Sequence, residues 1–127
     1  MPDSIFTKII KGEIPSYKIY EDDLTFAFLT IEPTQPGQVL VIPKKQIEQL
    51  WNLPDADYSA VMNTVKKVAC RIKNVLGVSR VGVRVIGEEV PHAHIHLIPM
   101  NSAEDFYQKT YTASSEELAE MARKLAF

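Results

Sequence analysis

All three histidines of the 127-residue chain lie in one stretch, Pro91-His92-Ala93-His94-Ile95-His96-Leu97-Ile98-Pro99. They occupy every second position, and apolar residues fill the positions between them. Side chains two residues apart in a β-strand project from the same face. We therefore predict a strand over residues 90–100, with the imidazoles in one row and the intervening apolar side chains facing the core.

The spacing of this row limits its chemistry. At a rise of about 3.3 Å per residue, neighbouring histidines lie about 6.6 Å apart and the outer two about 13 Å apart. Zn–N bonds are only about 2.0 to 2.1 Å long, so one neighbouring pair could chelate a metal, but all three could not. An extended anion such as a polyphosphate or a phosphoryl ester fits such a row better, because each imidazole can donate, accept or carry charge. The middle residue, His94, would then lie closest to the reacting phosphorus.

Two other interpretations of the row remain open. The histidines could form a solvated strand face without a function, or one pair could bind a metal. No Cys-x-x-Cys or His-x-x-x-His spacing in the chain completes a tetrahedral ligand set, so we expect no metal site.

Composition sets the class of protein. The chain has 46% hydrophobic and 24% charged residues, which is typical of a globular protein, and its length predicts a single domain over residues 1–127. A net charge of -2 argues against nucleic acid as a partner. No apolar run reaches the length of a membrane span, so we expect no membrane partner. One cysteine excludes an intrachain disulfide, and we predict a cytoplasmic location.

The remaining patterns predict an α+β fold with an antiparallel sheet. Ser4 caps a short helix over residues 4–11, and residues 17–20 and 25–29 form a hairpin. Residues 38–42 are a third strand, and the apolar stripe over 55–76 is a long helix that Gly77 ends. A strand over 80–86 then joins the histidine strand through a tight turn at 87–89. Ser114 caps a terminal helix.

The stretch His92-Ala93-His94-Ile95-His96-Leu97-Ile98 matches the pattern His-φ-His-φ-His-φ-φ, where φ is apolar. This pattern is the signature of the histidine triad (HIT) family. Weaker matches run from Ile5 to about Met100, over residues 5–16, 20–23, 27–28 and 36–44. The chain thus resembles the HIT family, and in particular its small Hint-like and bacterial branch.

The resemblance implies a fold and an assembly. HIT proteins have a five-stranded antiparallel sheet with one long helix, here accompanied by shorter terminal helices. The HIT-like core would cover about residues 4–100, followed by a C-terminal helical extension over about 102–127. Members usually form homodimers through helix and strand contacts, so we expect a homodimer.

The resemblance also implies a mechanism, in which the middle histidine attacks the α-phosphorus of a nucleotide and water then hydrolyses the nucleotidyl-histidine. By motif position His94 is the nucleophile, and His92 and His96 orient the site and bind phosphate oxygens. Covalent catalysis of this kind requires a neutral imidazole whose other nitrogen is held by an acceptor. No cofactor is implied.

Nine residues form the nucleotide-binding set that we expect. The nucleoside pocket of the family corresponds to Ile5, Phe6, Phe28 and Ile31, although each of these could equally belong to the core. The set is completed by Leu29, Thr30, Glu88, Glu89 and Val90.

The chain departs from the family pattern at several of these positions. Thr30 stands where Hint-like proteins have a ribose-binding Asp, and it cannot act as a two-oxygen acceptor. Glu88 and Glu89 stand where the family has a phosphate-binding Gln and Ser/Thr. Because like charges repel, we expect both carboxylates to turn away so that only their backbone N–H groups serve the phosphate. The alternative is that Glu89 supplies the proton of the leaving group.

The family's zinc sites also differ here. Those sites use two cysteines, a histidine and the first triad histidine. The matching positions are Ser4, Thr7, Gln46 and His92, so a zinc of that type is not expected.

These features predict a HIT-family hydrolase or nucleotidyl transferase acting on a purine nucleotide derivative, either a phosphoramidate or a dinucleoside polyphosphate. The alternative is a nucleotide- or phosphate-binding HIT paralogue with little turnover. A third interpretation is a metal-binding strand in a protein that acts through protein interactions.

Overall fold

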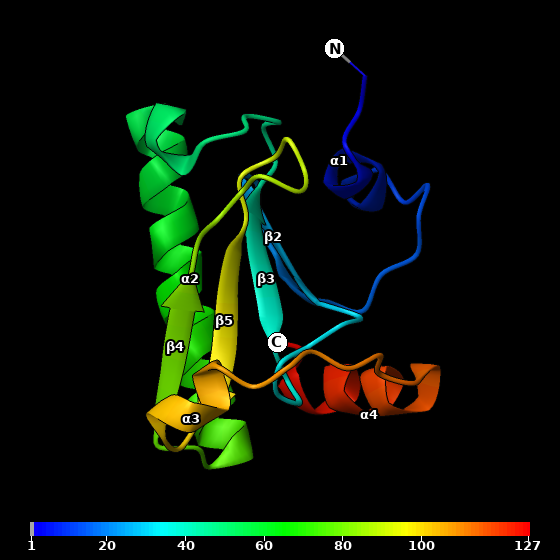
Figure 1. Cartoon of the computed structure of the whole chain (residues 1–127). Helices are drawn as coiled ribbons and strands as arrows, with labels where there is room; N and C mark the ends of the chain where they lie inside the picture. The colour runs from blue at the N-terminus through cyan, green and yellow to red at the C-terminus, as the bar shows by residue number, and fades with distance from the viewer. Residues whose placement is uncertain (1) are drawn as a thin grey trace.

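A five-stranded antiparallel sheet forms the centre of the computed structural model, which describes residues 2–127 (Figure 1). The strands lie in the order β1-β2-β3-β5-β4, and every neighbouring pair is antiparallel. Their bounds are β1 Lys18–Glu21, β2 Thr25–Leu29, β3 Val39–Pro43, β4 Arg80–Arg84 and β5 Ile95–Met100. The α+β class, the sheet and the predicted hairpin are confirmed.

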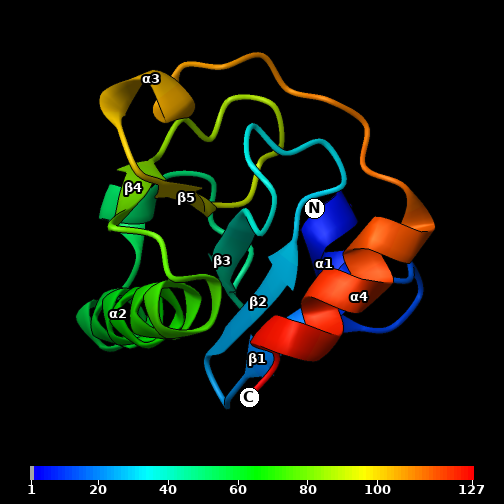
Figure 2. The same cartoon turned by 90° about the horizontal axis from the view of Figure 1, so that it is seen from below.

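In the described part of the chain, four α-helices accompany the sheet: α1 Ile5–Ile10, α2 Asp55–Leu76, α3 Ala103–Phe106 and α4 Ser115–Leu125. A short 3-10 turn, η1 Leu50–Asn52, precedes α2. The long helix has the predicted bounds, and Gly77 ends it in the left-handed region at φ 70. Figure 2 shows α2 and α1 on opposite sides of the sheet and α4 beside β1.

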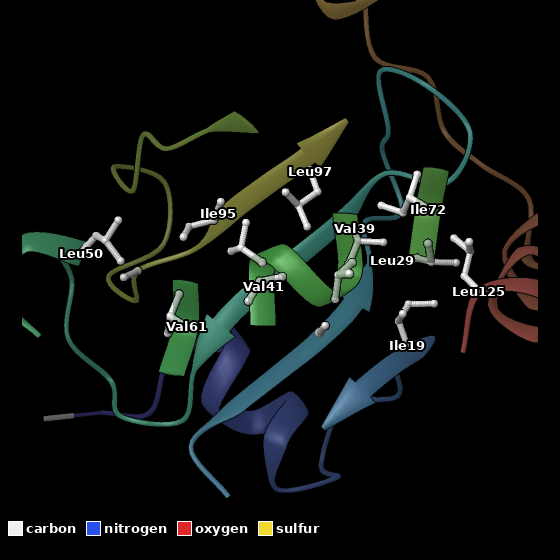
Figure 3. Close-up of a cluster of buried hydrophobic side chains, with 14 of the residues drawn as sticks. Ile19, Leu29, Val39, Val41, Leu50, Val61, Ile72, Ile95, Leu97 and Leu125 are labelled. Atoms are coloured by element: carbon white, nitrogen blue, oxygen red, sulfur yellow. The ribbon is translucent and has the colours of Figure 1, made fainter. Parts of the chain in front are cut away.

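The strands β2 and β3 are buried on both faces, and β3 lies at the centre of the sheet. Val39 and Val41 pack toward α2, whereas Leu40 and Ile42 pack on the other face with Phe6 of α1. This arrangement explains why β3 is a continuous apolar run, since neither face meets water. Figure 3 shows the larger cluster, in which side chains of the sheet meet those of α2 and α4, among them Val61, Ile72, Ile95, Leu97 and Leu125.

The two edges of the sheet differ. The end of the chain covers β1, since Phe127 donates its N–H to the carbonyl of Ile19 at 3.0 Å and Leu125 is fully buried. The opposite edge, β4, pairs with β5 on one side only and carries the exposed side chain of Val83. Among residues 2–127, no helix is long and apolar enough to cross a lipid bilayer.

The expected histidine strand is wrong in its first half. β5 begins at Ile95 instead of Val90, and β4 ends at Arg84, so the tight turn at 87–89 is in fact a loop over residues 85–94. Pro91 has no N–H for a ladder bond, and the N–H of Ala93 donates to the carbonyl of Ile47 instead, at 2.7 Å. Only His96 of the three histidines therefore lies within a strand.

Candidate functional site

The three histidines lie where the 85–94 loop enters β5, beside α1. His92 and His94 are buried, with 0% and 4% of their surfaces exposed, and His96 is half-buried. The centroid of the Phe6 ring lies 4.9 Å from that of His94 and 5.8 Å from that of His92. The centroids of the His94 and His96 rings are 5.2 Å apart. The imidazoles are thus contiguous although two of them precede the strand.

Protein groups engage both ring nitrogens of His92. Its Nε2–H donates to the carbonyl of Pro43 at 2.7 Å, and its Nδ1 accepts the hydroxyl of Ser4 at 2.8 Å. A carbonyl can only accept, which places the ring proton on Nε2. Burial lowers the pKa of His92, an effect that the neighbouring His94 reinforces and the bond to Pro43 opposes. His92 is therefore a neutral ring that is fully occupied by the protein.

His94 has the opposite tautomer. Its Nδ1–H donates to the backbone carbonyl of His92 at 2.8 Å, so in the neutral ring Nε2 carries a free lone pair. No group among residues 2–127 forms a hydrogen bond to that nitrogen. An unprotonated imidazole nitrogen oriented by a bond to the other nitrogen is the arrangement that a histidine nucleophile requires.

Gln38 determines the proton position on His96. The Oε1 of Gln38 accepts the N–H of Thr34 at 2.6 Å, so its Nε2 is the atom that donates to the Nδ1 of His96, at 3.2 Å. The pKa of His96 is lowered to about 4, chiefly by burial and in addition by the positive charge of Arg84 and by the nearby His94. His96 is therefore neutral near pH 7 and has an Nε2–H to donate.

An apolar pocket of about 220 Å³ lies beside the histidines, between α1 and the start of the sheet. Six of the nine expected nucleotide-binding residues line it: Ile5, Phe6, Phe28, Leu29, Thr30 and Ile31. Ile5 and Ile31 are 55% and 60% exposed, so they form the rim of the pocket and are not core residues. Phe6 faces both the pocket and the ring of His94, which places the pocket next to the histidines.

The other three expected residues lie elsewhere. Glu88 lines a second cavity, of about 290 Å³, together with Trp51 and Ile86. Glu89 is exposed on the loop, and Val90 packs against the cluster that contains Phe6. The Oγ1 of Thr30 accepts the N–H of Glu32 at 3.3 Å, within its own loop.

A hydrogen-bonded cluster occupies the positions that correspond to the family's zinc ligands. The Oε1 of Gln46 accepts the Oγ–H of Thr7 at 2.8 Å and the backbone N–H of Ser4 at 2.7 Å. Ser4 in turn contacts His92, as described above. These four side chains thus satisfy one another by hydrogen bonding.

Sequence reasoning missed three residues of this site. The sequence predicts Gln38 only as part of a strand and Ser4 as a helix cap and a match to a zinc-ligand position, and it does not single out Arg84. The structure pairs Arg84 directly with His96 across β4 and β5. A buried polar residue such as Gln38, only 2% exposed, indicates a specific hydrogen-bond partner, but its burial is not visible in the sequence.

Comparisons with known proteins identify the family of the chain. The family model described as "HIT domain" matches residues 11–103. An uncharacterized HIT-like protein of Borreliella burgdorferi is 42% identical over 106 residues, which cover 78% of this chain and 76% of that protein. The purine nucleoside phosphoramidase of Escherichia coli K12 is 37% identical over 103 residues, covering 76% and 86%.

A solved structure supports the same relationship. The crystal structure of a Hit-like protein involved in cell-cycle regulation from Bartonella henselae superposes with a TM-score of 0.86 at 34% sequence identity. The match covers 97% of this chain and 94% of that one. Together with the histidine signature and the fold, these similarities show that the chain belongs to the HIT family.

Proposed function

We propose that this chain is a nucleotide hydrolase or nucleotidyl transferase that cleaves at the α-phosphate of a purine nucleotide derivative, a phosphoramidate or a dinucleoside polyphosphate. The observation that carries the proposal is the bond from His94 Nδ1–H to the His92 carbonyl, which leaves Nε2 free as a nucleophile. Similarity to the Escherichia coli purine nucleoside phosphoramidase supports the substrate class.

The reaction proceeds in two displacements. The Nε2 lone pair of His94 attacks the α-phosphorus, and the bond from phosphorus to the leaving group breaks with its electron pair on the leaving group. Water then attacks the same phosphorus, the P–N bond breaks, and the nucleoside monophosphate departs. One water is consumed in total: its hydroxyl stays on phosphorus, and its proton balances the one that the leaving group has taken up. Nδ1–H remains bonded to the His92 carbonyl throughout.

The outer histidines have different roles in this proposal. The Nε2–H of His96 donates to a phosphate oxygen and stabilises the negative charge that develops in the transition state. His92 has no free nitrogen, so we assign it a positioning role: its ring holds the peptide whose carbonyl orients His94. Contacts of Glu88, Glu89 and Val90 with the phosphate stay predictions.

The purine nucleoside binds in the apolar pocket. Phe28 forms its floor, and the exposed side chains of Ile5 and Ile31 would lose water when the base enters. Thr30 offers one hydroxyl toward the ribose, in place of the two oxygens of a carboxylate.

We also propose a homodimer that forms along β4. This edge has unpaired backbone groups, and the exposed apolar side chains of Val83 and Ile86 lie on or beside it. Exposed Trp51, Tyr58 and Met62 on η1 and α2 extend the apolar surface. Open edges and apolar patches of this kind are features of protein interfaces. The cytoplasmic location stays a prediction.

The test is to incubate the purified protein with adenosine 5′-phosphoramidate, to measure AMP release, and to repeat the assay with His94→Gln. We expect the variant to lose activity by about 10³-fold or more, because a nucleophile has no substitute. Denaturing the wild type at alkaline pH during turnover should trap AMP covalently on the protein, at His94 by peptide mass spectrometry. Circular dichroism checks that the variant is folded.

The outcomes separate the alternatives. Stoichiometric binding of AMP by the wild type without turnover would instead support the binding paralogue. Activity that survives in His94→Gln would contradict the assigned nucleophile. Unchanged turnover in Glu89→Gln, which we expect, would exclude this carboxylate as the proton donor of the leaving group.

A further inference from the structure

Arg84 lies at the end of a row of side chains that crosses the sheet. Four residues are direct partners in successive strand pairs: Phe28 with Leu40, Leu40 with His96, and His96 with Arg84. Directly opposed residues of an antiparallel pair project from the same face. The row therefore runs over β2, β3, β5 and β4, in the order in which Figure 1 and the strand pairing place them.

The chemistry of the row changes along its length. Phe28 and Leu40 line the apolar pocket, His96 presents a neutral donor, and Arg84 is a permanent cation. Neighbouring strands are about 4.8 Å apart, so Arg84 lies about one strand spacing beyond the histidines and about 10 Å from Leu40. A nucleotide with its base in the pocket and its α-phosphate at β5 would place the next group of the molecule over β4.

The guanidinium of Arg84 lacks a protein partner for its inner nitrogen. The Nε atom is buried and has no hydrogen-bond acceptor, and within residues 2–127 no ion pair involves this side chain. Arg84 is the direct cross-strand partner of His96, and its positive charge is, after burial, a cause of the lowered pKa of His96. A buried donor without a partner is unfavourable, which indicates that an acceptor from outside the chain completes it.

We propose that Arg84 binds a phosphate on the leaving-group side of the scissile bond, so that the protein prefers nucleotides whose leaving group carries phosphate to those that release an uncharged amine. This inference rests on the proposed function. Arginine binds phosphate through two parallel N–H···O bonds, which gives both charge and directional fit. Ammonia or an uncharged amine presents no oxygen to this fork.

Diadenosine triphosphate is an example of such a substrate, and its cleavage can be written step by step. The Nε2 of His94 attacks one α-phosphorus, the bond from this phosphorus to the bridging oxygen breaks, and ADP leaves with the electron pair on that oxygen. Arg84 stabilises the charge that appears on the departing phosphate. Water then releases AMP from His94.

The experiment compares kcat/KM for diadenosine triphosphate and for adenosine 5′-phosphoramidate, which share the nucleoside and the α-phosphate but differ in the leaving group. In Arg84→Gln we expect the ratio of triphosphate to phosphoramidate kcat/KM to fall about 10- to 100-fold, the effect of losing a hydrogen bond to a charged group. Arg84→Lys keeps the charge but loses the fork, and its ratio should lie between those of the wild type and Arg84→Gln.

Arg80→Gln is the matched control. Arg80 lies four residues earlier on the same face of β4, opposite Met100, and is exposed, so it tests the loss of one positive charge without loss of the subsite. Its ratio should equal that of the wild type. A ratio unchanged in Arg84→Gln, or lowered equally in Arg80→Gln, would overturn the inference. Because the phosphoramidate is assayed in parallel, failure of the proposed function would appear separately, as absent AMP release by the wild type from both substrates.

Discussion

His94 is oriented by the backbone of His92: its Nδ1–H donates to the His92 carbonyl at 2.8 Å. The ring of His92 is itself held between the carbonyl of Pro43 and the hydroxyl of Ser4. The proposed nucleophile therefore depends on a chain of bonds that reaches from the loop before β5 to Ser4, the residue before α1. Each bond in this chain involves a buried group, so each can be tested by its effect on stability.

Ser4→Ala should destabilise the protein by about 2 to 3 kcal/mol. The change removes the cap of α1, worth about 1 kcal/mol, and also removes the 2.8 Å donor of the buried Nδ1 of His92. The other hydroxyl near this nitrogen, that of Thr7 at 3.4 Å, donates to Gln46 instead. Urea denaturation measures the difference in unfolding free energy. Ser114→Ala is the control, because Ser114 caps α4 by the same contact but bonds to no histidine. Equal losses in both variants would contradict a bond between Ser4 and His92.

Stability should decrease as the pH falls from about 6.5 toward 4. His96 has a pKa of about 4 in the folded state, against an ordinary value of 6.5 for a histidine in the unfolded chain, and the pKa of His92 is lowered as well. In this window the unfolded state binds more protons than the folded state, so the unfolding free energy rises with pH. The contribution of the histidines to this free energy is complete above about pH 6.5. Urea denaturation at several pH values measures the slope.

His96→Gln should flatten that slope, since glutamine does not titrate. The carboxylate of Glu21 also makes stability depend on pH, but only near and below its ordinary pKa of 4.5. The reason is that its pKa in the folded state is lowered, chiefly by a hydrogen bond from Lys44. Measurements above pH 5 therefore isolate the histidines. A slope that is the same in the wild type and the variant would show that His96 titrates normally in the fold.

Ile31→Ala should weaken substrate binding without unfolding the protein. Ile31 lies at the rim of the pocket and is largely exposed, so the unfolding free energy should change by less than about 0.5 kcal/mol. Loss of apolar contact with the base should raise KM for adenosine 5′-phosphoramidate about fivefold, with kcat retained. Leu24→Ala, on the β1–β2 turn away from this pocket, should change neither constant. A normal KM in Ile31→Ala would place the base elsewhere.

Val83→Glu should dissociate the proposed dimer. A carboxylate on β4 would face its own copy or an apolar surface across the interface, which should raise the dimer dissociation constant by about 100-fold or more. Sedimentation velocity over a range of concentrations measures this constant. Leu24→Glu adds the same charge at the hairpin turn and should leave it unchanged. A wild type that sediments as a monomer would refute the proposed interface.

The elements with a strong local pattern were predicted correctly. The stripe of apolar residues sets the bounds of α2 at Asp55–Leu76, and Gly77 ends the helix with a positive φ that glycine adopts without strain. The histidine strand was predicted too long because alternation of polar and apolar residues does not distinguish a paired strand from an extended loop. That distinction depends on a distant partner: the N–H of Ala93 bonds to Ile47, outside the sheet ladder.

The candidate site was predicted in part. The histidine spacing singled out the three rings, and the family resemblance indicated the six residues that line the apolar pocket. Gln38 and Ser4 were missed as ring partners because the bonds that they form span 58 and 88 residues. Arg84 was missed because its place beside His96 depends on strand register, which local periodicity does not specify.

The sequence by itself determined the family signature, the α+β class and the type of most elements, because each follows from the spacing of residues near one another in the chain. Only the tertiary structure decided which nitrogen of each imidazole carries the proton. The three rings share one motif, yet the carbonyl of Pro43 and the hydroxyl of Ser4 fix the proton position of His92, and the amide of Gln38 fixes that of His96. The proton position of His94 is fixed by the carbonyl of His92, as the loop before β5 folds back on itself. Hydrogen-bond partners select the tautomer, and the fold alone brings those partners to the rings.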